Sequence, residues 1–106
     1  MKLTLEQEMV LRAIPLKKPT LKENIITRKD ISKITGINTR EVSYIIESLR
    51  DEFPICSDRG NGGYWMGNEN ECKKFIHECL NHAKGLKNTA SKMMKYISQE
   101  IVFDDD

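Results

Sequence analysis

Apolar residues in the first half of the chain recur at helical spacing and are divided by residues that start and stop helices. Thr4 followed three residues later by Gln7 is typical of a helix start, because the two side chains satisfy each other's backbone amides. Pro15 ends this helix, since proline withholds an amide and crowds the preceding turn. We therefore predict a first helix over about 4–14 whose shared apolar face holds Leu5, Met9, Val10, Ala13 and Ile14.

A second capped helix follows a loop that contains two prolines and three lysines. Thr20 and Glu23 imitate a cap within the loop, which predicts one further turn there, and Asn24 opens a brief β-prone run. Thr27 with Asp30 then predicts a helix that carries its isoleucines, Ile31 and Ile34, inward and ends at Gly36. Glycine suits this end because it adopts the positive φ of a tight helix-terminating turn.

The third helix has the most clearly divided faces. Asn38 with Glu41 caps its start, Pro54 bars its continuation, and we predict a helix over about 39–52. One side is apolar and consists of Val42, Ile45, Ile46, Leu49 and Phe53. The opposite side is polar and consists of Thr39, Arg40, Ser43, Tyr44 and Glu47. This helix should therefore bury one face and leave a chemically varied face in solvent.

Beyond Pro54 the period of the pattern changes from helical spacing to two. Residues 55–57 and 64–66 are β-prone arms, and the glycine-rich stretch 58–63 between them predicts a β-hairpin with a wing at 57–64. The glycines do not form a phosphate-binding loop, because no helix and no Lys-Ser/Thr pair follows them. Trp65 and Tyr64 are either stacking platforms for single-stranded nucleic acid or, as strand aromatics more often are, a cover for the core.

A long helix closes the chain. Asn68 with Glu71 caps a helical region that we expect to run to about Gln99. Its apolar positions are alternately four and three residues apart, a 3.5-residue period that favours a partner helix, and the predicted dimerisation positions are Ile76, Cys79, Ala83, Leu86, Ala90, Met93 and Ile97. The alternative is a break near Gly85, with both pieces folding back on the preceding domain. We expect domain boundaries at 1–67, 68–101 and an acidic tail at 102–106.

The charge distribution qualifies this picture. The formal net charge is only +1, but three of the sixteen acids are the final residues of the chain. Between Arg12 and Arg50 nine bases face four acids, a local surplus of +5 that suits a polyanionic partner. Lys84, Lys87, Lys92 and Lys95 have no acid among them, and either contact a phosphate backbone or face water.

The order of helix, helix, glycine turn, helix and glycine-rich hairpin resembles the winged helix-turn-helix family of DNA-binding domains, and residues 27–66 carry the likeness. The "PICS" and "GYW" segments are also similar to small regulatory or replication-associated proteins of bacterial phages and other mobile elements. The resemblance implies a fold that is mainly α with a small β-hairpin, here extended by the long C-terminal helix. It further implies sequence-specific binding of double-stranded DNA by a transcriptional or replication regulator, with the wing reaching a neighbouring groove.

The residue types on the third helix agree with that function. The major groove admits one α-helix, and an outward Arg40 suits a bidentate pair with guanine, whereas Thr39 and Ser43 suit bases or phosphates. The full set of predicted DNA-binding residues is Arg28, Lys29, Lys33, Asn38, Thr39, Arg40, Ser43, Tyr44 and Arg59.

The main alternative is a winged-helix adaptor that binds another protein and not DNA. It is favoured by four acids along the third helix, Glu41, Glu47, Asp51 and Glu52, which would repel phosphates if they faced the groove. A salt-dependent interaction with duplex DNA would separate the two hypotheses.

The sequence also predicts several absences. We expect no enzymatic activity, cofactor, metal or small-molecule ligand, because no nucleophile lies beside a base and only Cys79 and His82 share a helix face at metal-ligand spacing. The charged N-terminus and the short apolar runs predict a soluble, cytoplasmic protein that does not bind membranes. The three cysteines, Cys56, Cys72 and Cys79, are then expected to be reduced thiols.

Overall fold

The computed structural model describes residues 2–97. The protein is mainly helical, with one small antiparallel sheet and a long C-terminal helix, as the sequence predicts. The described residues divide into two units, one ending at Phe75 and the other beginning at Ile76.

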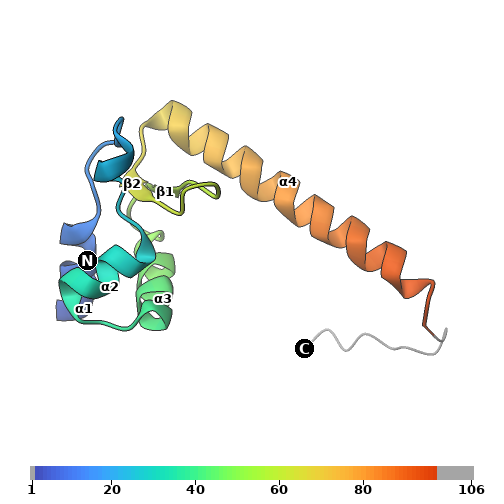
Figure 1. The fold of residues 1–106 in the computed structure, drawn as a ribbon, viewed down its shortest axis with the longest axis horizontal. Coiled ribbons are helices and arrows are strands. Elements are labelled where there is room, and N and C mark those ends of the chain that lie inside the picture. The colour runs from blue at the N-terminus through green and yellow to red at the C-terminus, as the bar shows by residue number, and fades with distance from the viewer. Residues whose placement is uncertain (1, 98–106) are drawn as a thin grey trace. The chain divides into compact units, whose positions relative to one another are not determined.

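Three helices enclose the core of the first unit (Figure 1). They are α1 (Leu5–Ala13), α2 (Arg28–Thr35) and α3 (Thr39–Leu49), and each of them contacts the other two. The buried core consists of apolar side chains from all three helices and the first strand, namely Val10, Ile14, Ile31, Val42, Ile46, Leu49 and Ile55. Burying one such side chain contributes about 1.5–3 kcal/mol, so this cluster is the main source of stability in the unit.

The predicted helix starts are confirmed by their hydrogen bonds. The Gln7 backbone N–H donates to Thr4 Oγ1 at 3.1 Å, and the Thr4 N–H donates to Gln7 Oε1 at 2.9 Å. The same reciprocal pair joins Thr27 and Asp30 at the start of α2. At the other end of α2, Gly36 has a φ of 78°, the left-handed conformation expected of it.

Two predicted core residues are in fact exposed. Leu5 is 73% exposed, because Val10 and Ile14 define the buried side of α1 and Leu5 lies roughly opposite them on the helix. Ile34 is 63% exposed, because α2 turns Ile31 and Thr35, which lie one helical turn apart, toward the interior. In both helices the apolar stripe is wider than the surface that the neighbouring helices cover.

The loop before α2 contains a short helical turn, but its cap differs from the prediction. A 3-10 helix spans Lys22–Asn24, and it begins after Leu21 without a side-chain cap. Thr20 therefore does not play the role that its spacing from Glu23 predicted.

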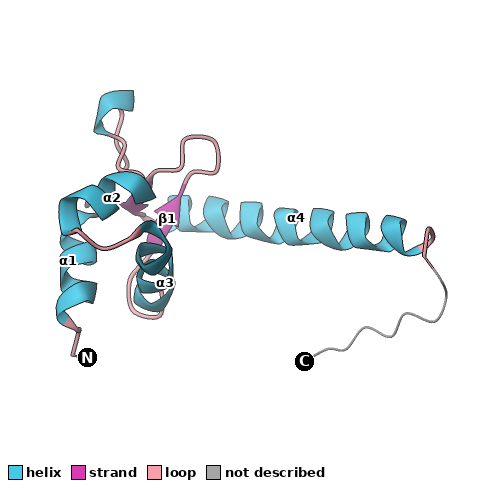
Figure 2. Ribbon diagram, turned by 60° about the horizontal axis from the view of Figure 1, so that its bottom comes forward, coloured by secondary structure: helices cyan, strands magenta, loops and turns pink. Residues whose placement is uncertain are grey.

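The predicted hairpin is present with the predicted arms. Figure 2 draws the strands in magenta. Strands β1 (Ile55–Ser57) and β2 (Tyr64–Met66) are antiparallel, with Cys56 opposite Trp65. The other edge of β2 is also bonded: the Tyr64 N–H donates to the Ile26 carbonyl at 3.0 Å, and Thr27 and Gly63 form an isolated bridge. The β-prone residues before α2 thus bond to the edge of β2 that β1 does not pair with.

The aromatic residues of β2 serve the core. Trp65 is 6% exposed, and the Lys18 ammonium lies 5.1 Å from the centre of its ring. Tyr64 is half-buried against the core cluster. Of the two roles considered for these side chains, covering the core is the one that the structure shows for Trp65.

The long helix α4 (Glu69–Met94) begins at the predicted cap, where Asn68 and Glu71 exchange two hydrogen bonds of 2.9 Å. Its residues up to Phe75 belong to the first unit, which therefore extends past the boundary predicted at residue 67. The helix is continuous through Gly85, so the break considered there is absent. It ends at Met94, before the predicted end at Gln99, and leaves Ile97 beyond the last helical turn.

The acidic tail at 102–106 lies outside the described residues. None of the helices within residues 2–97 combines the length and the apolar character that crossing a bilayer requires.

The contact between the hairpin and the segment before α2 can be tested at Gly63. A Cβ at this position would lie 2.6 Å from Ile25 Cγ2, so we expect Gly63→Ala to lower the free energy of unfolding by about 1–3 kcal/mol through overpacking. Gly60→Ala is the matched control, because its Cβ would meet nothing closer than Asp58 Oδ1 at 3.4 Å. Urea denaturation of both variants measures the difference, and equal stabilities would contradict the contact.

Candidate nucleic-acid interface

Packing of α3 leaves its polar side free, and this side adjoins the start of α2. We call the combined surface of Arg28, Lys29, Thr39, Arg40, Ser43 and Tyr44 the basic face. Arg28, Lys29, Arg40 and Tyr44 are exposed, whereas Thr39 and Ser43 are half-buried. Arg40, Ser43 and Tyr44 are three and four residues apart, so they form one continuous strip along the helix.

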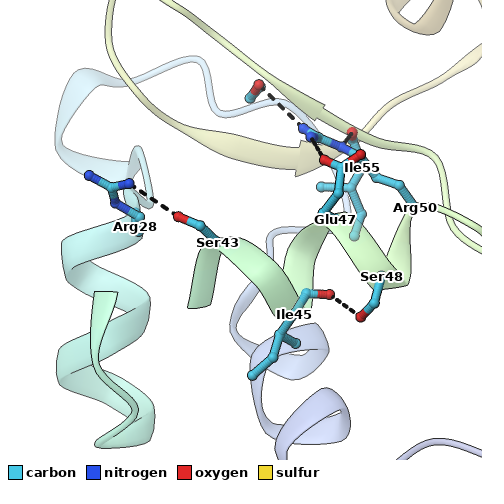
Figure 3. Close-up of polar contacts among 8 residues, drawn as sticks. Arg28, Ser43, Ile45, Glu47, Ser48, Arg50 and Ile55 are labelled. Carbon is cyan, nitrogen blue, oxygen red and sulfur yellow. Dashed lines mark hydrogen bonds and ion pairs between the residues drawn. The ribbon is translucent and has the colours of Figure 1, made fainter. Parts of the chain in front are cut away.

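A hydrogen bond joins the two helices of the basic face. Arg28 Nη1 donates to Ser43 Oγ at 3.1 Å, and Figure 3 shows the guanidinium reaching from the first turn of α2 toward α3. The Ser43 hydroxyl in turn donates to the Thr39 carbonyl at 3.3 Å. The cation of Arg28 is thereby held next to the outward strip of α3.

A second contact lies within the strip. Arg40 Nε donates to the Tyr44 hydroxyl at 3.4 Å, one helical turn away. Tyr44 is 58% exposed, so its ring is accessible to a partner. The pair presents a guanidinium and an aromatic ring side by side to solvent, and both groups are common in nucleic-acid contacts.

Residues at the starts of α3 and α2 form capping hydrogen bonds. Asn38 Oδ1 accepts the backbone N–H of Glu41 at 2.9 Å, so this oxygen of a predicted DNA-binding residue caps α3. At the start of α2, Asp30 accepts bonds from the Thr27 backbone N–H at 2.9 Å and from the Thr27 hydroxyl at 3.0 Å. These two bonds, the first the stronger cause, hold the pKa of Asp30 below its usual 3.8, and Lys33 adds a smaller effect in the same direction.

The hairpin loop closes one side of the basic face. A shallow hollow is lined by Thr27, Arg28, Lys29, Gly62 and Tyr64, so the first turn of α2 and the loop share one surface. Arg59 is exposed in the same loop, and Lys33 is exposed one turn beyond Lys29 on α2. The structure therefore brings the loop next to two of the three predicted α2 cations, Arg28 and Lys29.

Of the four acids predicted on α3, one is paired with a base, one adjoins Tyr44 of the basic face, and two follow the end of the helix. Glu47 forms an ion pair with Arg50 at 3.1 Å, and Arg50 Nε also donates to the Ile55 carbonyl at 3.0 Å (Figure 3). Glu41 lies on the flank of α3 that faces α1, where it lines a hollow together with Glu6 and Tyr44. Asp51 and Glu52 follow the end of the helix. The first two turns of α3 thus carry one exposed base, Arg40, and one exposed acid, Glu41, and most of the positive charge of the basic face comes from the start of α2.

Arg50 has a structural role that the sequence did not indicate. Besides its bonds to Glu47 and Ile55, its guanidinium lies 5.0 Å from the centre of the Phe75 ring. It ties the end of α3 to β1 and to the first turns of α4. Removing Arg50 and its partner Glu47 from the charge count leaves eight bases and three acids between Arg12 and Arg50, so the local surplus of +5 persists.

The predicted dimerisation positions lie on one side of α4 within the second unit. From Ile76 to Met94 this unit is a single helix, and every one of these apolar side chains is exposed within it. Leu80 and Met94 widen the stripe, and helix geometry places Lys84 and Lys92 on the opposite side, whereas Lys95 follows the end of the helix. Ile97 follows the end of the helix and does not extend the stripe as a helical position.

Some predicted contacts are brought together and others are not. One hydrogen bond joins Arg28 to Ser43 and another joins Arg40 to Tyr44, and Lys29 shares a hollow with the hairpin loop. Sequence reasoning missed Gly62 and Tyr64 as neighbours of the α2 cations, because no local signal links a hairpin to a helix start 35 residues earlier. Among the described residues, no group of three or more His, Cys, Asp and Glu is arranged to hold a metal ion.

Comparison with protein-family models, with curated proteins and with solved structures finds no match to this chain. The function must therefore be argued from the geometry of the basic face and of the C-terminal helix.

The capping role of Asp30 predicts a pH-dependent stability. Because folding lowers the pKa of this carboxyl, its ionised form stabilises the fold above the usual Asp range, and this contribution is lost as the pH falls through the folded pKa. We expect Asp30→Asn to be less stable than the wild type at pH 7 and the gap to shrink below about pH 4. Urea denaturation at several pH values measures this, and a gap that widens on acidification would contradict the role of the ionised carboxylate.

Proposed function

We propose that this protein binds double-stranded DNA sequence-specifically through the basic face and acts as a regulator of transcription or replication. The supporting observation is the arrangement of α3: its apolar side is buried, and its outward N-terminal turns present Arg40 and Tyr44 beside the α2 cations. A major groove about 12 Å wide admits one such helix. In this proposal the chain is a winged helix-turn-helix protein that works in the cytoplasm, as small phage or mobile-element regulators do.

The order of elements supports the proposal. Three mutually packed helices are followed by a two-stranded hairpin, and the residues before α2 bridge to β2. In a winged helix-turn-helix protein the second helix braces the recognition helix, which here corresponds to Arg28 holding Ser43. The hairpin loop with Arg59 would be the wing.

Each predicted residue then has a role. Arg40 contacts a guanine edge, and Tyr44 contacts a thymine methyl or a sugar. Thr39, Ser43 and the free amide of Asn38 bind nearby bases or phosphates. Arg28, Lys29, Lys33 and Arg59 bind phosphates and fix the position of α3 on the duplex. Because Ser43 already accepts a bond from Arg28, these two side chains would meet a phosphate as a unit.

A salt titration tests the proposal. We expect the full-length protein to bind mixed-sequence duplex DNA with an affinity that falls steeply with salt, because several counterions are released. Selection from random duplexes should then enrich one sequence. Lys29→Ala should weaken binding to selected and mixed DNA alike, whereas Arg40→Ala should reduce the difference between them by about 1–3 kcal/mol.

The outcome also separates the proposal from the adaptor hypothesis. An adaptor would bind duplex DNA weakly at every ionic strength and would enrich no sequence. If the amide NMR signals of α3 did not move in the presence of excess duplex at low salt, the basic face would not be the DNA-binding surface. Equal effects of the two substitutions would mean that α3 contacts phosphates and not bases.

We further propose that the protein is a homodimer joined by α4. A single helix cannot bury its own apolar side, and the 3.5-residue spacing of Ile76, Cys79, Ala83, Leu86, Ala90 and Met93 fits a second copy of the same helix. The lysines on the opposite side would stay in solvent. A module of this size buries only about 600–1,000 Å² on DNA, so two copies on paired half-sites would gain affinity.

Substitutions on the two sides of α4 test the dimer. Leu86→Glu introduces a charge into the apolar stripe, and Asn88→Glu introduces the same charge on the lysine side. Both residues are exposed in the helix, so neither change should unfold it. In sedimentation velocity the wild type and Asn88→Glu should be dimers and Leu86→Glu a monomer. A monomeric wild type at micromolar concentration would refute the dimer.

A further inference from the structure

Two of the three cysteines lie against each other in the first unit. Cys56 is on β1 and is 1% exposed, and Cys72 is half-buried in the first turn of α4. Their Sγ atoms are 3.8 Å apart, although 16 positions separate the residues in the chain. Disulfide formation requires a separation of about 2.05 Å, so a small shift of the two side chains would bring the sulfur atoms to bonding distance.

The backbone at Gly67 encloses this pair. The Gly67 carbonyl lies 3.7 Å from Cys72 Sγ. A Cβ on Gly67 would collide with Cys56 Sγ and lie 3.4 Å from Cys72 Sγ, so a side chain at this position would displace the sulfurs. The absence of a side chain at Gly67 is thus part of what lets the two cysteines meet.

The two thiols differ in reactivity. Burial, aided by the hydrogen bond that the Cys56 thiol donates to Cys72, raises the pKa of the Cys56 thiol to about 12. Cys56 is therefore a poor first nucleophile at neutral pH. Cys72 is partly exposed and is the member of the pair that an external reagent can reach. Such a pair of one accessible and one buried thiol has the arrangement of an attacking and a resolving cysteine.

We propose that Cys56 and Cys72 form an oxidisable dithiol that reacts with low-molecular-weight disulfides of the glutathione type. The Cys72 thiolate attacks one sulfur of the small disulfide, which forms a mixed disulfide and releases one small thiolate. Cys56 gives up its proton, attacks Cys72 Sγ and releases the second small thiolate. The two protein thiols are oxidised to one disulfide, and the small disulfide is reduced to two thiols, which take up the two protons.

A disulfide between Cys56 and Cys72 would have a structural consequence. It would join β1 to the first turn of α4 and close a loop over residues 57–71, which contains the hairpin tip. Constraining a loop of this length in the unfolded chain raises stability substantially. Oxidation of this pair does not depend on DNA binding, because the two thiols are brought together only by the packing of the hairpin against the start of α4.

The test uses the full-length protein, reduced and then incubated in its native state with oxidised glutathione. Free thiols are blocked by alkylation, and the tryptic peptides are analysed by mass spectrometry. Cleavage after Arg50, Arg59, Lys73, Lys74 and Lys84 places the cysteines in three different peptides, 51–59, 60–73 and 75–84. We expect a disulfide between peptides 51–59 and 60–73, and a melting temperature roughly 10 °C above that of the reduced protein, reversible with dithiothreitol.

Matched variants assign the steps. Cys79→Ser should leave the cross-link intact, because Cys79 is exposed in the second unit. Cys56→Ser should instead accumulate the mixed disulfide of Cys72 with glutathione, since the resolving thiol is gone. The proposal is overturned if wild-type Cys72 retains glutathione, if it cross-links to Cys79, or if both Cys56 and Cys72 are alkylated after the incubation.

Discussion

The burial of one side of α3 is the constraint on which the rest of the molecule depends. Val42, Ile46 and Leu49 are almost completely removed from solvent by α1, α2 and β1. Because side chains on a helix have fixed angular positions, burying these three determines which residues remain outside. Arg40, Ser43 and Tyr44 face solvent for that reason, and the basic face is a consequence of core packing as much as of charge.

The end of α3 is a second organising point. Arg50 bonds to Glu47, to the Ile55 carbonyl and to the face of Phe75, and so connects α3, β1 and the start of α4. Cys56 and Cys72 meet between the last two of these elements. The first turns of α4 are therefore part of the unit formed by the helices and the hairpin. The contacts of Arg50 and the pair of thiols both lie at this junction.

The acidic and basic side chains of α3 occupy different positions on the helix. The acids that argued against a nucleic-acid partner are present, but Glu47 is neutralised by Arg50 and Glu41 lies toward α1. The cations of α2 lie at the opposite side, beside the hairpin loop. The cations at the start of α2, Arg28 and Lys29, therefore carry most of the positive charge of the basic face.

The sequence by itself determined the local elements: the starts of all four α-helices, the glycine end of α2, the arms of the hairpin and the continuous apolar stripe of α4 all follow from signals within a few residues. It did not determine which part of each apolar stripe is covered, so Leu5 and Ile34 were misplaced in the core. Nor did it show that Arg28 bonds Ser43, that Ile26 pairs with β2 or that Cys56 meets Cys72. These contacts join segments far apart in the chain, and only the packing of the whole unit brings them within reach.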